Sequence, residues 1–142
     1  MRPETLDRHI DDLCTRHGIR RVAGRGRAVV IRVAHRDGSR ERLLEIRIPP
    51  VRGQVSYFIA LHEIGHLVGQ GRSGRRLERE AAAWRFALAE ALVAPTDTTR
   101  RRLGRRLRSY VTWAEMRARR AQAPFVPPAN DPFWHLLAWL EH

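Results

Sequence analysis

The chain has 142 residues, a length that suits one domain with a proper hydrophobic core. Its net charge of +12 includes 27 cationic residues, all arginine, and favours anionic partners such as nucleic acid or an acidic protein surface. The sequence has no apolar run of transmembrane length, no signal-peptide pattern at its N-terminus and a single cysteine, Cys14. These features exclude an intramolecular disulfide and predict a soluble, cytoplasmic protein that does not bind membranes.

The N-terminal third combines one helix with β-rich runs. Apolar residues at helical spacing predict a helix over 3–17 that ends at Gly18 and carries Cys14 as a small core residue. The runs 28–34 and 43–48 predict an antiparallel hairpin with a loose tip, and 19–23 supplies a short third strand.

Helices dominate the rest of the chain, so the predicted fold class is α+β. The expected helices are 54–68, 76–94 before Pro95, 97–108 capped by Thr96 or Asp97, 112–122, and the short apolar helix 133–140. Domain organisation is predicted as one domain over 1–122, followed over 123–142 by a proline-rich linker and the last helix, docked on the same domain. The alternative for this last helix is a partner-binding or self-association patch.

Residues 62–66 read His62-Glu63-Ile64-Gly65-His66, an H-E-x-x-H string. Histidines four positions apart lie on one helical face, so both imidazoles can reach a single metal ion. Glu63 can hold a water molecule against that metal and accept its proton. The string is therefore typical of a zinc peptidase, in which three protein ligands leave the fourth position open.

The spacing alone leaves the third zinc ligand open. Arg72 stands where the H-E-x-x-H-x-x-G-x-x-H pattern needs another histidine, and arginine does not ligate zinc, so that pattern is excluded. Glu78 and Glu80 on the following helix are carboxylate candidates, and small alanines at 81–83 would let two helices approach closely. The weaker candidates are His135 and His142.

In the order of its motifs, the chain resembles the ImmA/IrrE zinc metallo-endopeptidases over residues 5–95. The matching segments are His17-Gly18-Ile19, a small β-hairpin, Tyr57-Phe58-Ile59-Ala60-Leu61 before the H-E-x-x-H string, Glu80-Ala81-Ala82-Ala83-Trp84-Arg85-Phe86-Ala87, and Leu92…Pro95. Trp84 departs from the pattern because the family usually has a small polar residue there, and the segment ending at Pro95 is displaced by two residues. The resemblance implies a mostly helical, zincin-like (minimal gluzincin) fold with a small hairpin or three-stranded sheet before the active-site helix.

The resemblance also implies a site. One Zn²⁺ per chain would be bound by His62, His66 and Glu80, or by Glu78 in the alternative register. Zinc lowers the pKa of its bound water toward about 7, and Glu63 would act as general base.

A donor for the oxyanion is needed as well, and Tyr110, His135 or an arginine are candidates. Family members are typically encoded by phages and mobile elements and cleave helix-turn-helix repressors. The implied substrate is therefore a DNA-binding repressor.

Six of the nine residues from Arg100 to Arg108 are arginine. On a helix they cover most of the circumference and leave Leu103 and Leu107 as a narrow apolar seam. This pattern permits nonspecific nucleic-acid contact, although a solvated face explains it too.

Two rival hypotheses concern activity. The main one is a catalytically inactive zincin scaffold that acts as a basic regulatory or nucleic-acid-associated protein, such as a toxin–antitoxin component or phage regulator. The second is a purely structural zinc site. Glu63 argues against both, because a structural site fills its fourth position and needs no adjacent base.

Overall fold

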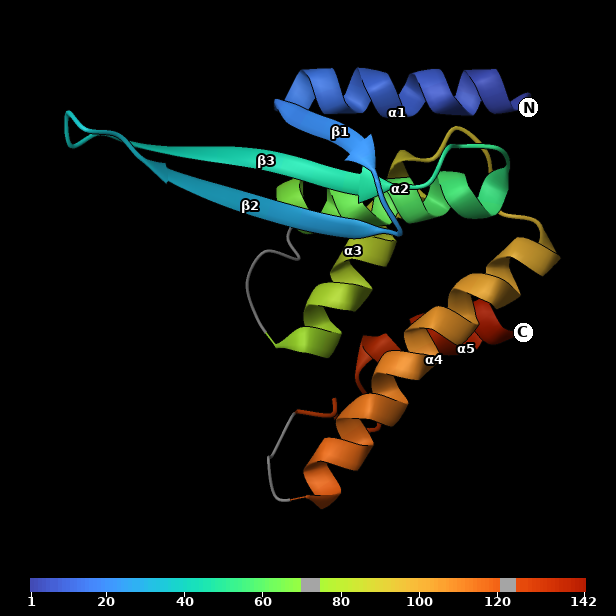
Figure 1. Cartoon of the computed structure of the whole chain (residues 1–142). Helices are drawn as coiled ribbons and strands as arrows, with labels where there is room; N and C mark the ends of the chain where they lie inside the picture. The colour runs from blue at the N-terminus through green and yellow to red at the C-terminus, as the bar shows by residue number, and fades with distance from the viewer. Residues whose placement is uncertain (70–74, 121–124) are drawn as a thin grey trace.

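The structure, a computed structural model, describes residues 1–69, 75–120 and 125–142 (Figure 1). Its elements are α1 (Pro3–His17), β1 (Ile19–Ala23), β2 (Arg27–Ala34), β3 (Arg40–Ile48), α2 (Gln54–Val68), α3 (Arg76–Glu90), α4 (Asp97–Arg119) and α5 (Pro132–Glu141). The predicted α+β class is confirmed. Within the described ranges, no helix has the length and apolar character needed to cross a membrane.

Helix α1 has the bounds that the sequence predicts. It ends at Gly18, whose φ of 65° lies in the left-handed region that glycine adopts without strain. The predicted apolar stripe is buried, and it includes the thiol of Cys14. Burial raises the pKa of this thiol to about 11, as expected of a core residue rather than a nucleophile.

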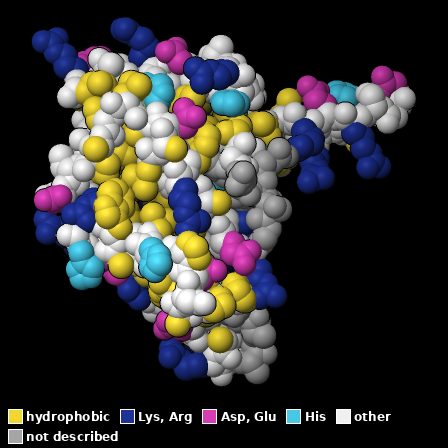
Figure 2. All heavy atoms as spheres, turned by 180° about the vertical axis from the view of Figure 1, so that it is seen from behind, with side chains coloured by type: hydrophobic (Ala, Val, Ile, Leu, Met, Phe, Trp, Pro, Cys, Tyr) yellow, Lys and Arg dark blue, Asp and Glu magenta, His cyan; other side chains and the backbone are white. Residues whose placement is uncertain are grey.

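The three strands form one sheet in the order β1-β3-β2. Strands β2 and β3 are antiparallel, as predicted, whereas β1 runs parallel to β3 on its other side. The hairpin is longer than expected, because Arg40 already pairs with Ala34 and only residues 35–39 form the tip. Strand β2 therefore lies at an edge, and the far end of the hairpin projects from the body of the molecule (Figures 1 and 2).

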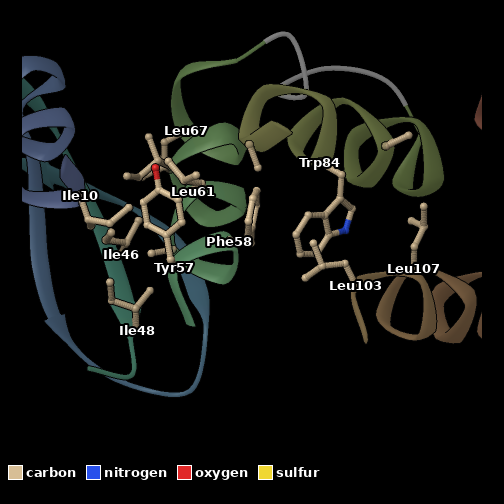
Figure 3. Close-up of a cluster of buried hydrophobic side chains, with 14 of the residues drawn as sticks. Ile10, Ile46, Ile48, Tyr57, Phe58, Leu61, Leu67, Trp84, Leu103 and Leu107 are labelled. Atoms are coloured by element: carbon tan, nitrogen blue, oxygen red, sulfur yellow. The ribbon is translucent and has the colours of Figure 1, made fainter. Parts of the chain in front are cut away.

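One face of the sheet is apolar and packs against helices. Ile46 and Ile48 of β3 are buried with Ile10 of α1 and Tyr57 of α2 (Figure 3). The hydroxyl of Tyr57 lies 2.7 Å from Nδ1 of His9, which links α2 to α1. Because alternate strand residues point to opposite faces, β2 and β3 present one side to α2 and the other away from it.

Helix α2 is buried nearly all round because α3 and α4 cover the side that faces away from the sheet. Figure 3 shows Trp84 of α3 between Phe58 of α2 and Leu103 of α4. The seam of Leu103 and Leu107 is fully buried, as the sequence predicts for the arginine-rich segment.

Two predicted helix boundaries are wrong. Helix α3 ends at Glu90 rather than near residue 94, because Ala91 leaves the helical conformation and the Leu92 N–H donates to the Tyr57 hydroxyl at 3.0 Å. The expected helices 97–108 and 112–122 are one helix, α4. Buried Val111 continues the apolar seam across the expected break.

Of the two predicted caps, Thr96 and Asp97, the structure has Thr96, whose side chain accepts a hydrogen bond from the Thr99 N–H. The expected end at residue 122 lies outside the described residues, as do the first two residues of the predicted linker.

Helix α5 lies against α4. Its side chains Phe133, Leu137 and Leu140 are buried, and Arg108 of α4 forms an ion pair with Glu141. A Cβ added to Gly104 of α4 would lie 3.0 Å from the Leu140 carbonyl carbon, so the two helices touch through backbone. The last helix is therefore docked on α4, while Trp139 stays 48% exposed.

Candidate metal centre

Helix α2 carries the two histidines and the glutamate of the H-E-x-x-H string to the wall of a cleft. His62 and Glu63 are buried, with 3% and 6% of their surface exposed, and His66 is partly buried. The two imidazole rings lie 4.5 Å apart between centroids. One helical turn thus places both rings on the same side, as the spacing predicts.

The carboxylate that meets these histidines belongs to Glu80 of α3. Its Oε2 atom lies 2.8 Å from Nε2 of His62 and 3.3 Å from Nε2 of His66. Glu78, the alternative ligand, is exposed instead, and its Oε2 accepts a hydrogen bond from the Arg75 N–H. The structure therefore brings Glu80 to the histidines and leaves Glu78 outside the cleft.

Burial of Glu80 acts to raise its pKa, but hydrogen bonds with His62 and His66 outweigh this effect and lower the pKa to about 2. The side chain is only 4% exposed, so it is a buried carboxylate that stays ionised at ordinary pH. That is the charge state in which a carboxylate ligates a metal.

The two contacts that Glu80 makes with the histidines are compatible with a shared zinc ion. Ligand atoms about 2.0–2.1 Å from a tetrahedral ion lie about 3.3 Å from one another. The contacts that Glu80 makes with His62 and His66, 2.8 and 3.3 Å, need an opening of about half an ångström at most. Two imidazoles and one carboxylate are also a donor set found at catalytic zinc sites.

Glu63 lies beside His62, His66 and Glu80 and contacts the other ring nitrogen of His62. Its Oε1 lies 3.2 Å from Nδ1 of His62, whereas Nε2 of the same ring faces Glu80. Ligand atoms of His62, Glu63 and His66 lie within 4.8 Å of one another, so Glu63 is also near enough to hold a metal. By contrast, a single oxygen of Glu80 is in contact with the Nε2 atoms of both histidines.

Trp84 is a member of the site that the sequence analysis noted only as a departure from the family pattern. It lies one turn after Glu80 on α3 and stacks on the His62 ring, with centroids 4.1 Å apart and planes 20° apart. The indole is fully buried, and its Nε1 is the only buried side-chain nitrogen or oxygen among the described residues without a hydrogen-bond partner. The i, i+4 spacing from Glu80 was the signal that could have revealed this role.

Gly65, inside the H-E-x-x-H string, is where α2 and α3 come closest. A Cβ added there would lie 2.9 Å from the Ala83 carbonyl oxygen and 3.1 Å from the Ala83 Cα. The predicted close approach at the alanines is confirmed, with Gly65 as its counterpart on α2. This contact sets the distance between the helix that carries the histidines and the helix that carries Glu80.

The cleft has a volume of about 590 Å³. Its walls include Ala28 and Val30 of the edge strand β2, the ligand-bearing sides of α2 and α3, and Tyr110 of α4. Of the oxyanion donors suggested by the sequence, Tyr110 and arginines line the cleft, while His135 is exposed on α5 and does not. Burial raises the pKa of Tyr110, so its hydroxyl keeps the proton that a donor needs.

The arginine-rich first half of α4 is exposed on one side. Arg100 pairs with Asp97 and Arg108 with Glu141, whereas the guanidinium group of Arg106 lies near Gly26, one of the residues that line the cleft.

Comparison of the chain with protein-family models, with curated proteins and with solved structures gives no match. The resemblance to the ImmA/IrrE peptidases therefore stays a prediction from the motifs, and so does a repressor substrate.

Proposed function

We propose that this protein is a zinc-dependent endopeptidase. The observation that carries the proposal is the contact of one Glu80 oxygen with the Nε2 atoms of both His62 and His66, in the wall of a cleft. The residues that would hold the ion are these three. When bound, Zn²⁺ would supply Lewis acidity, which polarises a peptide carbonyl and makes a water molecule more acidic.

The protein's own side chains have separate roles in this proposal. Glu63 accepts a proton from the attacking water and passes it to the leaving amine. Trp84 fixes the plane of the His62 ring by stacking on it. Tyr110 donates its hydroxyl proton in a hydrogen bond to the oxygen that gains negative charge.

The unpaired edge of β2 is an argument for a peptide as the substrate. Its outer edge has no neighbouring strand among the described residues, and its side chains Ala28 and Val30 line the cleft. An unpaired edge offers backbone donors and acceptors, to which an extended peptide can add as a further strand. We expect the scissile bond to lie where this edge passes Glu63, because Gly26 of the β1–β2 turn adjoins the Glu63 carboxylate.

The proposal is tested by measuring metal and cleavage separately. The purified chain should contain close to one zinc per molecule by mass spectrometry of the metal. It should also cleave a helix-turn-helix repressor encoded by a neighbouring gene into discrete fragments. Glu63→Gln should keep the zinc and lose the cleavage. If the wild type binds zinc but cuts no more than Glu63→Gln, the inactive-scaffold alternative holds and the peptidase proposal is wrong.

A further inference from the structure

The cleft beside the candidate metal centre is strongly cationic. Its arginines come from the β2–β3 hairpin and from the first turns of α3; they are Arg27, Arg32, Arg42, Arg76 and Arg79. Among the described residues, the only carboxylates that line it are Glu63 and Glu80, which the proposed chemistry already uses. The charge of the cleft therefore exceeds what the chemistry of the site requires.

Most of these arginines have no ion-pair partner among the residues that the structure describes. Arg76 lies 3.7 Å from Glu80, but the other four form no ion pair with any residue in the ranges that the structure describes. Nearby acidic side chains are engaged elsewhere: Glu41 with His35, and Glu45 with arginines on the opposite face of the sheet. The cleft thus presents cations that are free to bind an anionic ligand.

Two of the cations form a like-charge pair. Arg32 of β2 and Arg42 of β3 are direct partners in the antiparallel register, so their side chains leave the same face of the hairpin. Like charges directly opposite each other destabilise a sheet. Figure 2 shows the projecting hairpin with basic side chains gathered along one side of it. Two neighbouring guanidinium groups are well suited to bind a carboxylate, because each offers paired N–H donors.

We propose that the cleft selects an acidic peptide segment, with Arg32 and Arg42 binding its carboxylates; this inference rests on the proposed peptidase function and names its substrate class. The strand register gives the distance between the scissile bond and the acidic residues. From Gly26, beside Glu63, to Arg32 is six residues, which is about 20 Å along an extended strand at about 3.3 Å per residue. Allowing for the reach of the arginine side chains, the acidic residues lie about four to six positions from the scissile bond, on one side only.

The same arginines would attract a nucleic-acid backbone, but two features favour a peptide. Ala28 and Val30 line the wall between Glu63 and Arg32, and these small apolar side chains suit the side chains of a peptide. The wall is also a strand edge, whose backbone groups pair with another strand rather than with phosphates.

Binding is measured first, with full-length zinc-loaded Glu63→Gln so that the probe is not cut. The probe is a labelled twelve-residue peptide with four glutamates, compared by fluorescence anisotropy with the same peptide carrying glutamine. We expect the acidic peptide to bind at least tenfold more tightly at low salt. Adding Arg32→Gln and Arg42→Gln should reduce that affinity about tenfold. The matched control, Arg8→Gln with Arg16→Gln, removes the same charge from exposed positions of α1 away from the cleft and should change it less than twofold.

Cleavage is measured second, with the wild type on a peptide library from a proteome digest. Asp and Glu should be enriched four to six positions from the cut on one side, and the enrichment should disappear in the Arg32→Gln, Arg42→Gln protein. Cleavage without such enrichment would overturn the acidic preference and leave the peptidase proposal intact. Arginine-dependent binding of the acidic peptide without any cleavage would support the acidic preference and overturn the peptidase proposal. If a labelled DNA duplex binds more tightly than the peptide and loses more affinity in the double variant, the cleft is a nucleic-acid surface and the inference is wrong.

Discussion

Replacement of Gly65 by alanine tests whether the contact between α2 and α3 sets the metal geometry. The new Cβ would lie 2.9 Å from the Ala83 carbonyl oxygen and 3.0 Å from a ring carbon of Phe86. A backbone oxygen cannot rotate away, so the helices must separate by about half an ångström to reach ordinary contact distance. Overpacking of this kind costs about 1–3 kcal/mol, and the better helix propensity of alanine returns at most about 1 kcal/mol.

The same displacement acts on the candidate metal ligands. Metal–ligand distances tolerate deviations of about 0.2 Å, which is less than the separation that Gly65→Ala requires. We therefore expect a net loss of about 1–2 kcal/mol in the free energy of unfolding and a fall in zinc affinity of tenfold or more. Urea denaturation of the metal-free protein and competition with a zinc chelator measure the two effects.

The control lies on the same helix. Gly53, the N-cap of α2, has nothing within 4 Å of an added Cβ and no left-handed φ, so Gly53→Ala should cost only the loss of a favourable cap residue, about 0.5–1 kcal/mol, and leave zinc affinity unchanged. If Gly65→Ala matches this control in both stability and zinc affinity, the helix contact does not position Glu80, and the reasoning is wrong.

Three other substitutions or measurements test individual residues of the site and core. Glu80→Gln should lower zinc affinity at least a hundredfold by chelator competition, while Glu78→Gln should leave it within about threefold; the opposite order would assign the ligand to Glu78. Tyr110→Phe should reduce kcat about 10- to 1000-fold with little change in KM, since a donor to the oxyanion acts in the transition state, and an unchanged kcat would remove Tyr110 from the mechanism. The Cys14 thiol, whose pKa burial raises to about 11, should react with a disulfide reagent at pH 8 only after denaturation, whereas rapid reaction of the native protein would contradict its place in the core.

The local geometry of the site follows from spacing, but the choice between Glu78 and Glu80 depends on tertiary structure. These two residues lie on nearly opposite sides of α3. The arginines at the start of the helix do not show which of the two sides is buried. The deciding signal was present in the neighbours of Glu80. Leu77 and Trp84, three before it and four after it, are buried, so Glu80 belongs to the apolar face that packs on α2.

The errors in helix boundaries also come from tertiary contacts. Proline at 95 suggested the end of α3, yet the helix stops four residues earlier than predicted, where the chain turns to give the Leu92 N–H to Tyr57 on another helix. Short-range patterns contain no information about that hydroxyl. The arginines of the cleft were likewise unpredictable, because their position depends on β2, rather than β3, being the edge strand beside α2.

Groups that lower the stability of the fold lie around the cleft, and this position supports a binding function for it. Away from the cleft, some of the charges are paired: Arg21 bonds both Asp7 and Asp11, and Arg108 bonds Glu141. Around the cleft, by contrast, lie the Arg32–Arg42 like-charge pair and the unpartnered Nε1 of Trp84. Each of these reduces stability in the protein alone. The like-charge pair is expected if an anionic substrate offsets its cost. Neutralising Arg42 should then raise the melting temperature while weakening the binding of acidic peptide, a trade that a purely structural role for the hairpin does not predict.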